Sequence, residues 1–304
     1  PLSYVRGARP AGFLAVLGSL FDGDLDAADK VEALREFIGA SLLGIASTYQ
    51  RAFVFVGDGA NGKSTILKII SALFSGELVT AISPQDMGQE YRRAMLSRSR
   101  LNIVSELPEA DIMDSAAIKA IVSGDRITAR AIRCDPFTFE PRCGNVFAAN
   151  SLPSVRDSSD GFWRKWIVLE FRRTFAVSEQ DTELADRIIA TELDQIASWA
   201  IDSTEPLTAR KHYTEPASSR AALAEWRSSA DTVYRYLSER TKPGESWTPA
   251  QTLYRDYCQW CQRNGHKNPS SAKFGRRLKS LRVEKKRTKN GVEYARSIVD
   301  RGSV

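Results

Sequence analysis

The 304-residue sequence is poor in cysteine and has no long apolar run, and each shortage excludes a class of protein. Four cysteines are too few for a disulfide framework in a chain of this length, which indicates a reducing compartment. No stretch approaches the roughly 20 uncharged apolar residues of a membrane-spanning helix. The N-terminal residues also lack the basic segment followed by an apolar segment that is typical of a signal peptide. We therefore expect a soluble, cytoplasmic protein.

Positive charge is concentrated in the C-terminal part of the chain. From Asp231 onward there are 17 lysines and arginines against seven acidic residues, a net charge of +10, which leaves −4 for the preceding residues. Because no apolar amphipathic face accompanies this charge, it favours a nucleic-acid partner over a membrane surface.

Two of the cysteines, Cys258 and Cys261, form a C-x-x-C pair that is compatible with zinc binding or with helix packing. A structural zinc site takes four ligands, and only His266 lies nearby in the sequence. Leu253, Tyr257 and Cys261 recur every four residues, which places them on one helical face. We therefore expect the cysteines to pack inside a helical domain rather than to bind metal.

Short apolar runs alternate with helical periodicity over the first two thirds of the sequence. Helices are expected over residues 64–73 and 181–202. Four buried strands are predicted, over residues 53–56, 101–104, 145–149 and 166–169. Such alternation predicts an α/β fold with a mostly parallel sheet.

The strongest local signal is the segment GDGANGKS, which matches the phosphate-binding pattern G-x-x-x-x-G-K-[ST] between a predicted strand and a predicted helix. Its glycines let backbone N–H groups surround phosphates, Lys63 reaches the β and γ oxygens, and the Ser64 hydroxyl binds Mg²⁺. The predicted nucleotide-binding residues are Gly57, Asp58, Gly59, Ala60, Asn61, Gly62, Lys63, Ser64 and Thr65.

Polar residues follow two of the other predicted strands. Glu106 is the predicted acid that holds Mg²⁺ and orients water, and Glu109 and Asp111 compete with it for this role. A carboxylate that caps a buried strand is costly without a partner, which favours Glu106. Asn150 is the predicted sensor, whose amide orients the attacking water.

The order and spacing of these motifs resemble superfamily 3 helicases, specifically the phage and plasmid primase-helicases and the related poxvirus primase-helicase. The resemblance covers about residues 13–175 and is carried by the blocks GDGANGKST, LNIVSELPE, IKAIVSGDRITARAI and VFAANSLP, followed by GFWRKW. It implies an AAA+-like ring, usually a hexamer, with ATP bound between subunits. It also implies a primase domain upstream. Because the chain starts at Pro1 rather than at Met, we expect it to be a piece of a longer protein.

The resemblance further implies an arginine finger that each subunit donates to its neighbour. The family often carries two adjacent arginines at this position, whereas this chain has Arg164 and Lys165. A guanidinium matches the spread charge of the transition state better than an ammonium does, so Arg164 is preferred and Lys165 remains the alternative.

The block between the second and third strands predicts a β-hairpin, with strands over residues 127–132 and 137–140 and a tight turn between them. In the family that the chain resembles, this hairpin contacts single-stranded DNA. Arg130 and Arg133 are therefore predicted to follow the phosphate backbone. Lys119 and Asp125 match recurring polar positions of the same block.

The C-terminal part predicts three helices and a hairpin, which is typical of a winged helix. A helix with a serine cap begins near Ser270, and Asn290-Gly291 is a hairpin signal. The predicted DNA contacts of this domain lie on that helix and on the wing after it. They are Lys273, Arg276, Arg277, Lys279, Lys285, Lys286, Arg287 and Lys289.

The sequence thus predicts an AAA+-like P-loop ATPase with a helical lead-in (1–50), an ATPase domain (51–205) and a linker with a winged-helix domain (206–304). The boundary is placed in the polar stretch 204–219. The predicted function is a hexameric, ATP- and Mg²⁺-dependent DNA helicase that translocates on single-stranded DNA in phage, plasmid or viral replication. Two alternatives remain: an ATP-switched DNA-binding initiator without processive unwinding, and a P-loop kinase or transferase.

Overall fold

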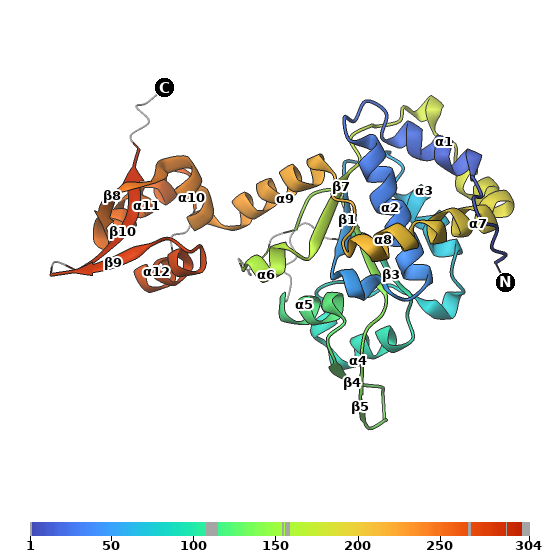
Figure 1. The fold of residues 1–304 in the computed structure, drawn as a ribbon, viewed down its shortest axis with the longest axis horizontal. Helices are drawn as coiled ribbons and strands as arrows, with labels where there is room; N and C mark the ends of the chain where they lie inside the picture. Colours follow the sequence, from blue (N-terminus) through green and yellow to red (C-terminus); the bar gives the residue numbers. More distant parts are fainter. Residues whose placement is uncertain are drawn as a thin grey trace. The chain divides into compact units, whose positions relative to one another are not determined.

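The computed structural model describes residues 2–107, 115–153, 155, 159–266, 269–289 and 291–299. The chain divides into two compact units between Leu223 and Ala224 (Figure 1). Within the described ranges, no helix is both long and apolar enough to cross a membrane.

A parallel sheet lies at the centre of the first unit (Figure 1). Its strands are β1 (Ala52–Val56), β2 (Val79–Thr80), β3 (Leu101–Leu107), β6 (Gly144–Ala149) and β7 (Trp166–Glu170). They are arranged in the order β2-β3-β6-β1-β7, and every pair is parallel. The mixed α/β class and the parallel sheet are thereby confirmed. Only the two-residue β2 was not predicted, because so short a strand leaves no pattern in the sequence.

Several helices of the first unit pack against the sheet and form a large hydrophobic core with it. Alternate strand residues face this core, among them Phe53 and Phe55 of β1 and Ile167 and Leu169 of β7. The remaining elements of the unit are α1 (Ala11–Leu20), α2 (Ala27–Leu42), η1 (Ala46–Tyr49), α3 (Lys63–Ala72), η2 (Gly76–Leu78), η3 (Asp86–Gly88), α4 (Glu90–Arg93), η4 (Ala94–Ser97), α5 (Ser115–Ser123), α6 (Asp160–Trp163), η5 (Val177–Glu179), α7 (Leu184–Asp202) and α8 (Thr204–Arg210). Residues of α1 and α2 belong to this core, so the predicted lead-in is part of the first unit rather than a separate domain.

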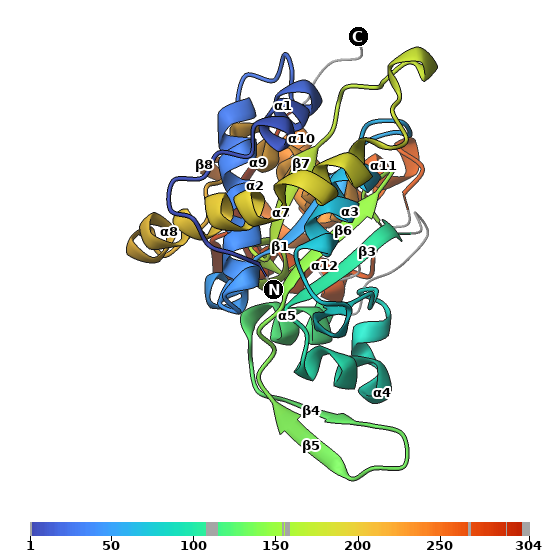
Figure 2. The ribbon, with the colours of Figure 1, turned by 90° about the vertical axis from the view of Figure 1, so that its right-hand side faces the viewer.

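The predicted hairpin is present as β4 (Ile127–Arg130) and β5 (Pro136–Phe139), which pair antiparallel. It projects from the body of the unit (Figure 2). The turn is longer than predicted, because Ile132 lies in it rather than in a strand and Pro136 begins β5. Arg133 adopts a left-handed backbone conformation (φ 60°) in this turn.

The predicted boundary segment packs on the first unit instead of linking two domains. It contains α8, and Tyr213 is buried in the core against Phe53. Thr214 donates its backbone N–H to Glu36 of α2 over 2.7 Å, and Arg210 forms an ion pair with the same carboxylate. The boundary falls instead within α9 (Ala217–Ala230).

The second unit consists of α10 (Thr232–Arg240), β8 (Thr241–Pro249), α11 (Ala250–Arg263), α12 (Ser271–Ser280), β9 (Lys285–Thr288) and β10 (Gly291–Ile298). The strands form an antiparallel sheet in the order β8-β10-β9. The second and third predicted helices and the hairpin are present, whereas the first, expected as one helix over residues 221–240, is divided at Asp231 into α9 and α10. β8 was missed because its sequence, TKPGESWTP, contains residues that disfavour strands; it lies at a sheet edge, where proline is tolerated.

Aromatic side chains fill the core of the second unit. Tyr236, Tyr257 and Phe274 are buried there, and Cys261 packs beside them on the predicted face of α11. Cys258 is only half-buried. Among the described residues, no three histidine, cysteine, aspartate or glutamate side chains are grouped closely enough to hold a metal ion.

Glu36 provides a test of how the 204–219 segment is attached. Its side chain is fully buried, and Arg210 and Thr214 are its partners. We expect Glu36→Ala to lower the free energy of unfolding by about 2–3 kcal/mol, because it leaves the Thr214 N–H and the Arg210 guanidinium without their acceptor. The measurement is urea unfolding followed by tryptophan fluorescence.

Glu32 on the same helix is the matched control. Its carboxylate is 36% exposed and pairs only with the half-exposed Arg35. Glu32→Ala should change stability by less than about 0.5 kcal/mol. Equal effects of the two substitutions would contradict the role assigned to Glu36.

Candidate functional site

The glycine-rich loop connects β1 to α3, as the sequence predicted. β1 ends at Val56, and α3 begins at Lys63. Gly62 caps this helix with φ 79°, and a Cβ at this position would lie 2.3 Å from Cδ2 of Leu20 in α1. Glycine is therefore favoured at position 62 by its left-handed backbone conformation, and the Leu20 side chain of α1 packs closely against it.

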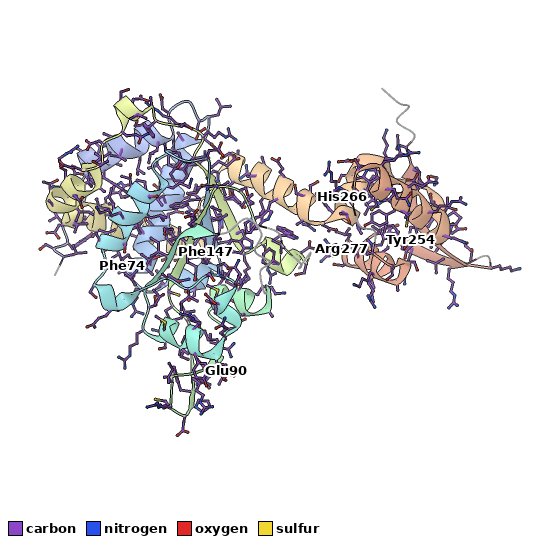
Figure 3. All side chains as sticks on the ribbon, turned by 180° about the vertical axis from the view of Figure 1, so that it is seen from behind. Phe74, Glu90, Phe147, Tyr254, His266 and Arg277 are labelled. Carbon is purple, nitrogen blue, oxygen red and sulfur yellow. The ribbon has the colours of Figure 1, made fainter. Side chains whose placement is uncertain are left out.

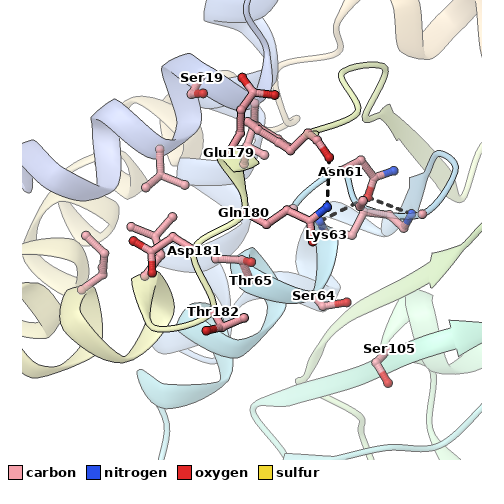
Figure 4. Close-up of a pocket in the computed structure, with 18 of the residues that line it drawn as sticks. Ser19, Asn61, Lys63, Ser64, Thr65, Ser105, Glu179, Gln180, Asp181 and Thr182 are labelled. Carbon is pink, nitrogen blue, oxygen red and sulfur yellow. Dashed lines mark hydrogen bonds between the residues drawn. The ribbon is translucent and has the colours of Figure 1, made fainter. Parts of the chain in front are cut away.

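A cavity of about 770 Å³ opens beside this loop (Figure 4). Three of the predicted groups meet in it: the loop residues 59–65, Glu106 and Asn150. β1, β3 and β6 are neighbours in the parallel sheet, so the residues at their carboxyl ends come to the same edge. Gly57 and Asp58 belong to the loop but do not line the cavity.

The opposite wall of the cavity was not predicted. It is formed by α1, through Ala15, Val16 and Leu20, and by the segment after β7, through Phe175, Leu184 and other residues. Glu179, Gln180, Asp181 and Thr182 of this segment also line the cavity (Figure 4), and the carboxylates of Glu179 and Asp181 pair with Arg173 and Arg187. The wall residues belong to no sequence motif. The apolar ones among them cannot be distinguished by sequence from residues of an ordinary hydrophobic core.

The Lys63 ammonium is held by acceptors of its own loop. Nζ donates to the carbonyl oxygens of Gly57 and Asp58 and to Oδ1 of Asn61, the last over 3.1 Å. Asn61 in turn donates to the Phe171 carbonyl over 3.4 Å. Burial lowers the pKa of Lys63. An anionic phosphate in the cavity would offer this ammonium a stronger acceptor than the neutral carbonyls.

Glu106 and Asn150 line the cavity as exposed side chains. The expectation that Glu106 caps a buried strand was wrong, because the pairing of β3 with β6 shifts between Val104 and Leu107 and leaves Glu106 at the surface. Ser64 and Glu106 provide a hydroxyl and a carboxylate, oxygen ligands of the type that Mg²⁺ prefers. The competing Glu109 and Asp111 lie outside the described residues.

The structure distinguishes the two candidate fingers. Lys165 is 2% exposed, and its Nζ donates to Oε1 of Gln50 over 2.8 Å and to Oγ of Ser123 over 2.6 Å. Arg164 is exposed. Of the two, only Arg164 therefore has a side chain that is accessible from solvent.

The polar residues of the hairpin region differ in their accessibility. Arg130 and Arg133 are exposed, and Nε of Arg130 donates to the Cys134 carbonyl over 2.9 Å. Asp125 is exposed at the start of the hairpin, whereas Lys119 is half-buried on α5. Both arginines are thus placed where a nucleic-acid backbone can reach them.

Arg277 is not available as a surface contact, contrary to the prediction. Arg277, which is labelled in Figure 3, is 9% exposed, and its Nη2 lies 2.6 Å from Oδ2 of Asp231. Asp231 also caps α10 by accepting the N–H groups of Val233 and Tyr234. Arg277 therefore connects α12 to the beginning of α10. It was predicted to face solvent because it lies among other basic residues in the run GRRLK.

The other predicted basic residues of the second unit are exposed. Lys286 also forms an ion pair with Glu293 over 3.3 Å and lies 4.4 Å from the ring of Trp247. The exposed set is Lys273, Arg276, Lys279, Lys285, Lys286, Arg287 and Lys289.

Comparison with known proteins identifies similar sequences in viruses. Residues 55–173 match a family of unknown function, DUF5906, and residues 228–300 match a family described as poxvirus D5 protein-like. "Putative helicase L207/L206" of Acanthamoeba polyphaga mimivirus is 26% identical over 172 residues, which are 50% of this chain and 17% of the relative. The chain resembles proteins of the viral primase-helicase type.

A second viral relative and a solved structure extend this likeness. "Putative helicase 184R" of Invertebrate iridescent virus 6 is 28% identical over 147 residues, 44% of this chain and 15% of the relative. The match thus spans less than a fifth of either viral protein. An apo structure of the NrS-1 C-terminal region aligns with a TM-score of 0.58 at 12% identity, over 98% of this chain and 78% of that one, which shows a shared fold.

The contrast between Arg276 and Arg277 can be tested directly. Arg277→Ala leaves the buried Asp231 carboxylate without its cation, so we expect it to lower the stability of the second unit by about 3 kcal/mol. Arg276→Ala should change stability by less than about 0.5 kcal/mol. Urea unfolding of both variants checks this difference, and a stable Arg277→Ala protein would show that the ion pair contributes little.

Proposed function

We propose that this primase-helicase-like chain is an ATP-hydrolysing DNA helicase of AAA+-like architecture that works as a ring, with six subunits as the expected number. The observation that carries the proposal is the cavity shared by Lys63, Ser64, Glu106 and Asn150. Lys63 would bind the β and γ phosphates, and Ser64 and Glu106 would hold Mg²⁺. The ion would screen the charge that develops on the phosphate oxygens, and Asn150 would orient the attacking water. The "helicase" names of the viral relatives support DNA unwinding as the use of this hydrolysis.

The position of Arg164 supports a site shared between subunits. Arg164 precedes β7, whereas the glycine-rich loop follows the parallel strand β1, which pairs with β7 from Ala52–Trp166 to Val56–Glu170. Five strand residues span roughly 17 Å, so Arg164 lies at the opposite edge of the sheet from its own Lys63. It can act on a γ-phosphate only if the nucleotide is bound by a neighbouring subunit, as in a closed ring of head-to-tail contacts.

Two surfaces are proposed to bind DNA. The projecting β4–β5 hairpin carries Arg130 and Arg133 for the phosphates of a single strand. The second unit has the order helix, strand, helix, helix, strand, strand, which supports a winged helix, with basic residues on α12 and on the β9–β10 wing.

A subunit-mixing experiment tests the shared site. Lys63→Ala and Arg164→Ala should each reduce ATP hydrolysis at least about a hundredfold. When the two variants are mixed before assembly, roughly one interface in four pairs an intact Lys63 with an intact Arg164, and hydrolysis should recover accordingly. A mixture of Arg164→Ala with the double variant Lys63→Ala/Arg164→Ala contains no such interface and is the control. Absence of recovery in the first mixture would contradict the shared site.

The hairpin can be tested through its own cysteine. Cys134 is exposed in the turn, whereas Cys143 is fully buried, and burial raises the pKa of its thiol to about 12. We expect a thiol reagent at pH 8 to modify Cys134 rapidly and Cys143 only after unfolding, because only the thiolate reacts. Single-stranded DNA should slow the labelling of Cys134. Arg133→Ala should remove this protection, and protection that survives the substitution would argue against the hairpin as a DNA contact.

A further inference from the structure

The buried side chain of Lys165 connects three parts of the first unit. Nζ donates to Gln50, which precedes the strand of the glycine-rich loop, and to Ser123, the last residue of α5. The Lys165 carbonyl accepts the N–H of Ala52, the first residue of β1, over 2.7 Å. One residue therefore joins the beginnings of β1 and β7 to the end of α5.

The end of α5 is also the base of the projecting hairpin. Gly124 follows Ser123 with φ 70°, and β4 begins three residues later. A Cβ at Gly124 would lie 2.9 Å from Oγ of Ser47 in η1 and 3.2 Å from the carbonyl of Pro141, which follows β5. The segments that lead into β4 and out of β5 therefore lie close together beside Ser123. Ser123 in turn accepts a hydrogen bond from Lys165.

The neighbouring Arg164 is fixed by its backbone while its side chain stays exposed. The Arg51 guanidinium donates to the Arg164 carbonyl, and Arg51 also pairs with Glu215 over 3.9 Å. The Arg164 backbone is thus held by Arg51 on one side and, through Lys165, by the end of α5 on the other. Burial, and then the charge of Arg164, lower the pKa of Lys165, as expected for an ammonium enclosed next to another cation.

We propose that Lys165 is a positioning residue that links the base of the β4–β5 hairpin to Arg164, so that DNA held by the hairpin controls the placement of the arginine at the neighbouring subunit's nucleotide. The proposal rests on the proposed function above. In this arrangement a displacement of the hairpin base moves Ser123, the Lys165 ammonium follows its acceptor, and Arg164 moves with the adjoining backbone. Lys165 itself touches neither DNA nor nucleotide.

The test is the stimulation of ATP hydrolysis by single-stranded DNA, measured as kcat and as KM for ATP in the whole chain. We expect Lys165→Met to reduce the stimulation factor on the order of fivefold or more, and Ser123→Ala to have a similar effect. The KM for ATP should stay within about twofold, because nucleotide binding does not involve this junction. In the double variant the second substitution should add little, because both remove the same hydrogen bond.

Lys30→Met is the matched control. Lys30 is equally buried, and its ammonium binds Asp24 and the carbonyl of Glu170 at the other end of β7. We expect this variant to lose thermal stability but to keep its stimulation factor. A role of Lys165 in stability alone would lower the DNA-free and DNA-bound rates together and leave their ratio unchanged.

The outcomes separate this proposal from the proposed function. A stimulation factor that is retained in Lys165→Met, or lost equally in Lys30→Met, would overturn the link while leaving the helicase proposal intact. Native protein that hydrolyses no ATP, or that does not respond to DNA, would overturn both. If Lys165→Met fails to fold, Ser123→Ala decides the question, because it removes a single hydroxyl group.

Discussion

The parallel pairing of β1, β3, β6 and β7 determines where every candidate site residue of the first unit lies. Because the strands run in one direction, their carboxyl ends bring the glycine-rich loop, Glu106 and Asn150 to one edge of the sheet. Their amino ends bring Arg164, Lys165 and the base of the hairpin to the other edge. The sheet thereby separates the residues proposed to bind the nucleotide from the residue proposed to act on a neighbouring subunit.

Patterns that depend on local sequence were sufficient to predict much of this fold. The longer strands, the loop before α3 and the hairpin follow from apolar runs, glycines and turn residues, and the structure contains all of them. The 204–219 segment was misjudged because its polar residues meet partners far away in the sequence. Thr214 and Arg210 contact Glu36, which lies more than 170 positions earlier in the sequence. A local sequence pattern cannot predict a contact between residues so far apart.

Buried charged residues are hard to recognise in the sequence, and Arg277, predicted as a DNA contact, is one of them. Glu36, Lys165 and Arg277 all resemble surface charges in the sequence, yet each is enclosed and has specific partners. Breaking such a pair by removing one partner is costly, so these residues constrain the structure more than exposed ions do. The cavity wall formed by α1 and the segment after β7 was missed for a related reason, because apolar residues that line a cavity have the same periodicity as residues that fill a core.

ATP-dependent unwinding of a forked DNA duplex, at protein concentrations that permit ring assembly, tests the central claim most directly. We expect the native protein to separate the strands and the Lys63→Ala protein, matched in fold and in DNA binding, to leave the duplex intact. DNA-stimulated hydrolysis without strand separation would contradict the helicase proposal and favour an ATP-switched initiator. Unwinding by the Lys63→Ala protein would show that strand separation does not depend on ATP hydrolysis in the cavity beside the glycine-rich loop.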